Sequence, residues 1–156
     1  MRDLTVNLVQ DELDWADPEA NRARFARRIA EAEPADLVVL PEMFTTGFTM
    51  TPDRHAEPAG GPTLDWMREQ AAASGAVVTG SVSVSDGGQY YNRLYWVTPG
   101  GEVSSYDKAH LFAMAGEQKQ YSPGRERLTV ELAGWRIRPV ICYDLRFPAW
   151  CRNSDD

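Results

Sequence analysis

A short uninterrupted apolar run at residues 37–40 constrains the fold more than any other part of this chain. Strands with one wet face alternate apolar and polar residues, whereas strands covered on both faces are continuously apolar. A helix is predicted directly before the run, because Asp17 can act as N-cap, Pro18 fits the first turn and Pro34 ends the helical spacing of apolar residues. The pattern predicts a buried strand in a sheet against which helices pack.

The remaining segments continue in a β-α-β-α order and then change to consecutive strands. Strands are predicted at 4–10, 37–40, 76–85, 90–98, 102–107, 128–132 and 135–142, and a second helix between Pro62 and Gly75. Turn residues at 86–88 and 133–134 join the strands on either side into hairpins, and a long polar loop is predicted at 109–127. This order predicts an α+β fold with a mixed sheet and helices on one face.

Composition and charge argue against several classes of protein. The 156 residues are 43% hydrophobic and 25% charged, which is typical of one globular domain, here 1–156. A net charge of −7 argues against nucleic-acid or anionic-membrane binding, but leaves room for a small anionic substrate near a local cation. The N-terminus shows no signal-peptide pattern, and no apolar run is long enough to span a bilayer. We therefore expect a cytoplasmic protein without nucleic-acid or membrane partners.

The two cysteines, Cys142 and Cys151, predict neither a disulfide framework nor a zinc site. Cys142 ends the predicted strand 135–142, and a polar, turn-prone segment follows it, which is a common place for chemistry in α/β architectures. A buried structural thiol is the alternative. To act as a nucleophile, Cys142 needs a cation that lowers its pKa or a base that takes its proton during attack.

Two other junctions between a strand and a loop offer charged partners for this thiol. Glu42 follows the strand 37–40, and Lys108 follows the strand 102–107. A structural ion pair or loop cap is the alternative for Glu42, and a surface position is the alternative for Lys108. Both have apolar neighbours, and a buried carboxylate or ammonium needs a partner. With Cys142 they make a plausible set for acyl transfer through a covalent thioester.

Other polar residues have less specific surroundings. Glu117 lies in the long loop. One interpretation is that it orients Lys108 or the substrate. The other is that it is solvated, and its residue type alone favours this second interpretation. His110 is expected to be structural and His55 to be exposed, although a Cys-His dyad remains open. For Arg146 we favour a structural ion pair over contact with substrate. Four aromatic residues are candidates for the lining of a substrate pocket, and packing in the core is the alternative for each: Phe44, Phe48, Phe112 and Phe147.

Three segments together resemble the carbon–nitrogen hydrolase (nitrilase) superfamily. They are LPEMF at 40–44, YDKAHLF at 106–112 and ICYDLRFP at 141–148, joined by GEQKQYSPG at 116–124. That superfamily uses a Glu-Lys-Cys triad in this chain order. Within it, segments 43–48 and 142–150 are similar to the ω-amidase branch, which deamidates 2-oxoglutaramate and related ω-amides of dicarboxylates.

The resemblance implies a role for each site residue. Cys142 attacks the amide carbonyl, and Glu42 takes the thiol proton, passes it to the leaving ammonia and later activates water. Lys108, together with the backbone N–H of Tyr143, stabilises the oxyanion. Glu117 matches the second glutamate of the superfamily, which supports positioning.

The resemblance also implies an architecture and an assembly. Members form a four-layer αββα sandwich and are considerably longer, so this chain is expected to cover the N-terminal part and the domain 1–156 to be incomplete at its C-terminus. The resemblance implies no metal or organic cofactor, and it implies a homodimer for the full-length protein. Nitrile or carbamoyl hydrolysis on the same scaffold, and a binding module without turnover, remain the alternatives.

Overall fold

The computed structural model describes residues 2–153 and contains a six-stranded mixed sheet. The strand order is β1 (Val6–Leu8), β2 (Leu37–Val39), β4 (Val77–Asp86), β5 (Gln89–Val97) and β6 (Val103–Asp107), and β3 (Glu57–Pro58) pairs with β4. The pairs β1–β2, β2–β4 and β3–β4 are parallel, whereas β4–β5 and β5–β6 are antiparallel. The predicted α+β fold with a mixed sheet is confirmed.

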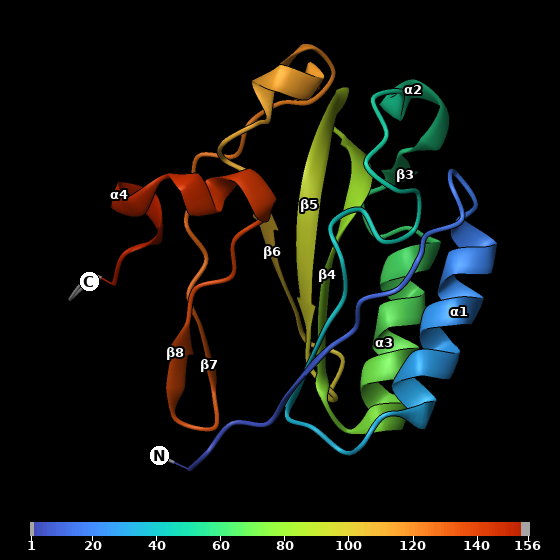
Figure 1. Cartoon of the computed structure of the whole chain (residues 1–156), viewed down its shortest axis with the longest axis vertical. Coiled ribbons are helices and arrows are strands. Elements are labelled where there is room, and N and C mark those ends of the chain that lie inside the picture. The colour runs from blue at the N-terminus through green and yellow to red at the C-terminus, as the bar shows by residue number, and fades with distance from the viewer. Residues whose placement is uncertain (1, 154–156) are drawn as a thin grey trace.

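Two helices, α1 (Pro18–Glu31) and α3 (Pro62–Ser74), lie side by side on one face of this sheet (Figure 1). Helix α1 begins as predicted, because Asp17 Oδ1 accepts a 3.0 Å hydrogen bond from the backbone N–H of Ala20. Helix α3 ends at Gly75, whose φ of +69° is the left-handed conformation favoured by glycine at this position.

Two apolar cores lie on opposite faces of the sheet, and the run at 37–40 contributes to both. Val38 packs in the core beneath the helices, where the rings of Phe25 and Phe44 meet edge to face with centroids 5.7 Å apart. Leu37 packs in the second core. Successive side chains of a strand point to opposite faces, so a strand between two cores must be continuously apolar. The predicted strand that is covered on both faces is confirmed.

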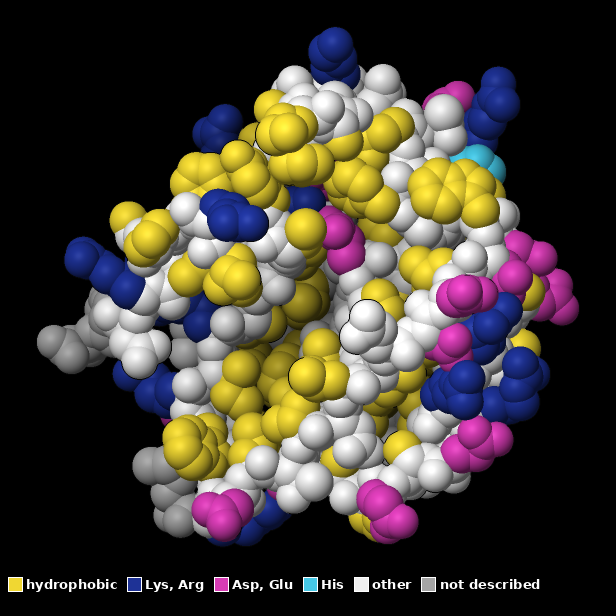
Figure 2. All heavy atoms as spheres, in the orientation of Figure 1, with side chains coloured by type: hydrophobic (Ala, Val, Ile, Leu, Met, Phe, Trp, Pro, Cys, Tyr) yellow, Lys and Arg dark blue, Asp and Glu magenta, His cyan; other side chains and the backbone are white. Residues whose placement is uncertain are grey.

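The hairpin of β7 (Val130–Leu132) and β8 (Trp135–Ile137) and the short helix α4 (Pro148–Cys151) lie on the side of the sheet opposite the helices (Figure 1). In Figure 2, hydrophobic side chains gather in the hollow between this part of the chain and the body of the molecule. A cavity of about 90 Å³ lies there, and its lining includes Glu42 and Cys142.

The predicted strand 135–142 is wrong in its second half. Strand β8 ends at Ile137, and Pro139 follows, which has no backbone N–H to donate to a neighbouring strand. Ile141 is still extended, and Cys142 then begins a short 3-10 helix, η3 (Cys142–Arg146). The thiol therefore lies at a turn beyond the strand rather than on its last residue.

Several short elements carry no periodic signal and were not predicted. The loop predicted at 109–127 contains two single-turn 3-10 helices, η1 (Ala113–Ala115) and η2 (Glu117–Lys119), and the helix α2 (Pro52–His55) precedes β3. Within residues 2–153, no helix combines the length and the apolar character needed to cross a bilayer.

Candidate active site

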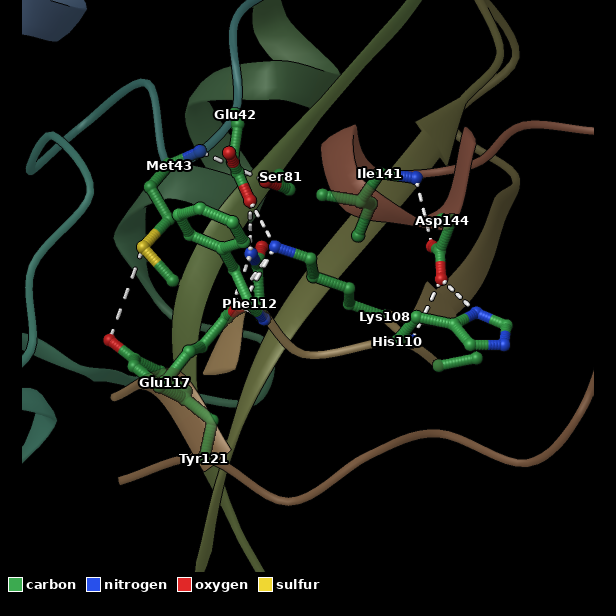
Figure 3. Close-up of polar contacts among 12 residues, drawn as sticks. Glu42, Met43, Ser81, Lys108, His110, Phe112, Glu117, Tyr121, Ile141 and Asp144 are labelled. Carbon is green, nitrogen blue, oxygen red and sulfur yellow. Dashed lines mark hydrogen bonds and ion pairs between the residues drawn. The ribbon is translucent and has the colours of Figure 1, made fainter. Parts of the chain in front are cut away.

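Lys108 is the centre of the polar cluster shown in Figure 3. It follows β6 directly, and its side chain is fully buried. Its ammonium nitrogen lies 2.7 Å from Glu42 Oε1 and 2.9 Å and 3.2 Å from the two carboxylate oxygens of Glu117. Burial acts to lower the pKa of Lys108, but the hydrogen bonds and charges of the two glutamates outweigh burial and raise it. Lys108 is therefore a buried cation with two anionic partners.

Glu42 begins a turn that is separated from β2 by Leu40 and Pro41. The turn is held against β4, because the Ser81 hydroxyl accepts a 2.9 Å hydrogen bond from the backbone N–H of Met43, and the Ser81 carbonyl accepts one of 3.2 Å from Phe44. Met43 itself has a φ of +46°, a left-handed conformation that is rare outside glycine. The Glu42 side chain is 20% exposed, so it faces both Lys108 and the open cavity.

Glu117 is fully buried in η2, so the solvated position that its residue type favours is wrong. Besides Lys108, its carboxylate accepts a 2.6 Å hydrogen bond from the backbone N–H of Phe112. These contacts join the long loop to the end of β6. Residue type alone does not separate this glutamate from the exposed Glu126 of the same loop, and only the resemblance to the superfamily distinguished it.

Asn92, on β5, is a further member of the cluster that sequence reasoning missed. Its amide nitrogen donates to Glu42 Oε1 at 2.8 Å and to Glu117 Oε1 at 3.2 Å, and the side chain is fully buried. The only available signal was a polar amide inside an otherwise β-rich, aromatic strand. The amide and the ammonium together hold the two carboxylates at fixed positions.

Cys142 lines the same cavity as Glu42. It is exposed, and its φ of +45° is again left-handed. The pKa of the thiol is raised, first by burial of the sulfur and then by the negative charge and hydrogen bond of Glu42, while Lys108 acts in the opposite direction. The site therefore keeps a protonated thiol beside a carboxylate that can accept its proton. Of the two ways to activate Cys142, this arrangement favours proton transfer during attack.

The other candidate residues occupy different positions. Tyr143 is half-buried, and its ring contacts Phe112 at a centroid distance of 5.1 Å. His110 lies 2.8 Å from Asp144 through Nδ1, as expected of a structural histidine. His55 lies in α2 and is half-buried rather than exposed.

The structural ion pair favoured for Arg146 is not formed within residues 2–153, where its side chain is exposed. Phe48 lies at the site, with its ring centroid 5.2 Å from the Lys108 ammonium, whereas Phe44 belongs to the core. Among the described residues, no three His, Cys, Asp or Glu side chains converge to hold a metal ion.

The model of the carbon–nitrogen hydrolase family matches residues 5–155 of this chain. The chain is 44% identical over 156 residues to the omega-amidase YafV of Yersinia enterocolitica, covering 100% of this chain and 60% of that protein. It is 35% identical over 154 residues to the 2-oxoglutaramate amidase of Bacillus subtilis, covering 96% of this chain and 59% of that protein.

The fold is also that of a solved superfamily member. The CN-hydrolase superfamily protein XC1258 of Xanthomonas campestris, which carries an arsenic adduct in its active site, superposes with a TM-score of 0.95 at 49% identity. The match covers 98% of this chain and 58% of that one. The chain thus spans about 60% of the length of these relatives.

Proposed function

The chain belongs to the carbon–nitrogen hydrolase family, and on this basis we propose that the whole protein hydrolyses a small ω-amide of a dicarboxylate to the acid and ammonia. The observation that carries the proposal is the buried Lys108, held between Glu42 and Glu117 next to the Cys142 thiol. This set supplies a nucleophile, a base and a cation within one site. The chemistry needs no metal or organic cofactor, and its other reactant is water.

In the first half of the reaction, Cys142 attacks the amide carbonyl carbon while Glu42 takes the thiol proton. The carbonyl π electrons move to oxygen, and Lys108 with the backbone N–H of Tyr143 stabilises this oxyanion. Protonated Glu42 then gives its proton to the amide nitrogen as the C–N bond breaks. Ammonia leaves, and the acyl group remains on Cys142 as a thioester.

In the second half, Glu42 takes a proton from water, and the hydroxide attacks the thioester carbonyl. The C–S bond breaks, and Cys142 recovers its proton, so the net reaction is amide plus water to acid plus ammonia. Glu117 touches no reacting atom in this scheme. It holds Lys108 and the backbone of Phe112, and therefore acts as a positioning residue.

The substrate class rests on the relatives. Omega-amidases and a 2-oxoglutaramate amidase match this chain over nearly its whole length, so 2-oxoglutaramate is the first substrate to test. A nitrile or a carbamoyl compound meets the same three groups and is the second candidate. A binding module without turnover is the third, and an unreactive Cys142 thiol would favour it.

The remaining expectations concern the whole protein. We propose one carbon–nitrogen hydrolase domain that includes residues 1–156, a homodimeric assembly and a cytoplasmic location. The domain and the homodimer follow from the resemblance to the superfamily. Light scattering of the full-length protein tests the assembly.

The test measures ammonia release from 2-oxoglutaramate by the protein carried to its natural stop codon. The Cys142→Ala variant tests the nucleophile, and Cys151→Ala is the matched control, because Cys151 is the second cysteine of the described chain. We expect the wild-type protein to release ammonia, the Cys142→Ala variant to release none, and the Cys151→Ala variant to release it as the wild type does. Release that survives Cys142→Ala would refute the mechanism, and no release with a reactive thiol would move the search to nitriles and carbamoyl compounds.

A further inference from the structure

Asp144 is the most heavily bonded acid among the described residues outside the Lys108 cluster. Its carboxylate is fully buried. Oδ2 accepts hydrogen bonds of 2.7 Å from the Tyr106 hydroxyl and 3.1 Å from the backbone N–H of Ile141. Oδ1 accepts one of 2.8 Å from the backbone N–H of His110 and lies 2.8 Å from His110 Nδ1 (Figure 3).

These four contacts belong to two segments that are far apart in the sequence. Tyr106 and His110 lie two residues before and two residues after Lys108. Ile141 immediately precedes Cys142, and Asp144 lies in the same 3-10 turn as Cys142. One buried carboxylate therefore joins the backbone around the cation to the backbone around the nucleophile.

The partners of Asp144 leave little freedom for rearrangement. The Tyr106 oxygen donates to Asp144 and already accepts hydrogen bonds from Trp150 Nε1 at 3.0 Å and from the backbone N–H of Ala109 at 3.3 Å. The His110 ring stacks on Phe147 with centroids 3.7 Å apart. The Tyr106 hydroxyl and the His110 ring are thus each oriented by a second contact, and only an acceptor at the position of Asp144 satisfies this hydroxyl and the two backbone N–H groups.

The backbone of Cys142 needs such support. Its φ of +45° is costly for a residue with a Cβ, and such a conformation persists only where the surroundings determine it. Two hydrogen bonds between Asp144 and Ile141 close the turn around Cys142, because the Asp144 carboxylate binds the N–H of Ile141 and the Asp144 N–H donates to the Ile141 carbonyl at 3.0 Å.

We propose that Asp144 is a positioning residue that sets the distance between the Lys108 ammonium and the Cys142 thiol. The expected change in kcat rests on the proposed function, whereas the expected shift of the turn that carries Cys142 does not. An asparagine at this position keeps the volume but offers a single acceptor oxygen. Its NH₂ group would face donors, so the turn that carries Cys142 would shift.

The test compares Asp144→Asn with Thr63→Val in the full-length protein. Thr63 is also buried in a polar network, with Glu57 and Arg22 at the start of α3, and it does not line the cavity. Three quantities are measured per folded protein: kcat and KM for the ω-amide, and the pH midpoint of Cys142 alkylation by iodoacetamide. Tryptic cleavage after Arg146 separates Cys142 from Cys151 for mass spectrometry.

For Asp144→Asn we expect a fall in kcat of roughly 100-fold with little change in KM, the size associated with a displacement of about 1 Å. The alkylation midpoint should move down toward that of an ordinary thiol, because the displaced sulfur would lose both its partial burial and its contact with Glu42. Thr63→Val should lose stability while keeping kcat and the midpoint. Unchanged kcat and midpoint in folded Asp144→Asn would overturn the proposal.

Two further arms keep the test decisive. Tyr106→Phe removes a single donor to Asp144 without changing shape, and we expect smaller changes in the same directions; if Asp144→Asn does not fold, an unchanged Tyr106→Phe overturns the proposal. If the wild-type protein releases no ammonia from the ω-amide, the proposed function fails. The alkylation midpoints still decide whether Asp144 positions the thiol.

Discussion

Replacing Glu117 by glutamine tests whether the buried ion pair holds the site together. The fully buried carboxylate accepts hydrogen bonds from Lys108, Asn92 and the backbone N–H of Phe112. A glutamine side chain has nearly the same volume, but its amide keeps one acceptor oxygen and turns an NH₂ group toward the remaining donors. The change removes charge and hydrogen bonding without opening a cavity.

The structure indicates that Glu117→Gln lowers the free energy of unfolding by an amount at the lower end of the range known for broken buried ion pairs. Breaking a buried ion pair on one side destabilises proteins by about 3–5 kcal/mol, because the other charge is left buried and unpaired. Here Lys108 keeps Glu42 at 2.7 Å, so a loss of about 3 kcal/mol in the free energy of unfolding is expected. For a protein of this size or somewhat larger, a loss of that size lowers Tm by about 6 to 12 °C.

Thermal unfolding of the full-length protein, followed by circular dichroism, measures this effect. The matched control is Glu126→Gln, the same chemical change at an exposed glutamate of the same loop, which should shift the free energy of unfolding by less than about 0.5 kcal/mol. Ammonia release per folded protein should also fall in Glu117→Gln, because Lys108 is no longer held on that side. Equal Tm values for the two variants would refute the role assigned to the Glu117 carboxylate.

Three further predictions follow from the same geometry. Gly80→Ala should lower the free energy of unfolding, measured by urea unfolding. An added Cβ would lie 2.8 Å from Leu40 Cβ and 3.0 Å from a ring carbon of Phe44. These two residues lie just after β2 and in the turn that carries Glu42. Asn92→Asp should reduce ammonia release, since a third carboxylate would replace the amide that donates to Glu42 and Glu117, whereas Asn92→Ser, which keeps a donor, should lose less. The rate of alkylation of wild-type Cys142 should rise with pH to a midpoint above that of a free cysteine peptide, because burial and then Glu42 raise the pKa of the thiol; a midpoint below the peptide value would contradict a protonated resting thiol.

The parts of the fold that were predictable from sequence are those with a local periodic signal. Alternate side chains of a strand point to opposite faces of the sheet. Because the run at 37–40 is apolar at every position, both faces of this strand had to be covered, and each face packs in one of the two cores. The strand predicted to end at Cys142 stopped at Ile137 instead. Val140 and Ile141 are again apolar beyond that point, but Pro139 removes the donor that pairing requires.

The sequence predicted those site residues that lie in a segment with a recognisable pattern. Glu42 and Lys108 stand at strand ends among apolar neighbours, and the structure brings them within 2.7 Å across a separation of 66 residues. Asn92 and Asp144 were missed, because their partners lie 50 and 38 residues away and no local pattern predicts such pairing. Burial of a polar side chain is decided by tertiary contacts, which is also why Glu117 was ambiguous.

The charges of the site explain why a buried lysine has two carboxylate partners. Two carboxylates surround one ammonium in the resting site, and burial followed by the negative charge of Glu42 raises the pKa of Cys142, which disfavours a thiolate before substrate arrives. In the proposed attack, Glu42 becomes neutral as the oxyanion forms, so the total charge of the site does not change. Neutral Glu42 holds the ammonium less strongly, which frees an N–H of Lys108 for the oxyanion, while Glu117 keeps the cation in place. A single carboxylate partner could not do both, because the charge that it loses on protonation would also be the charge that anchors Lys108.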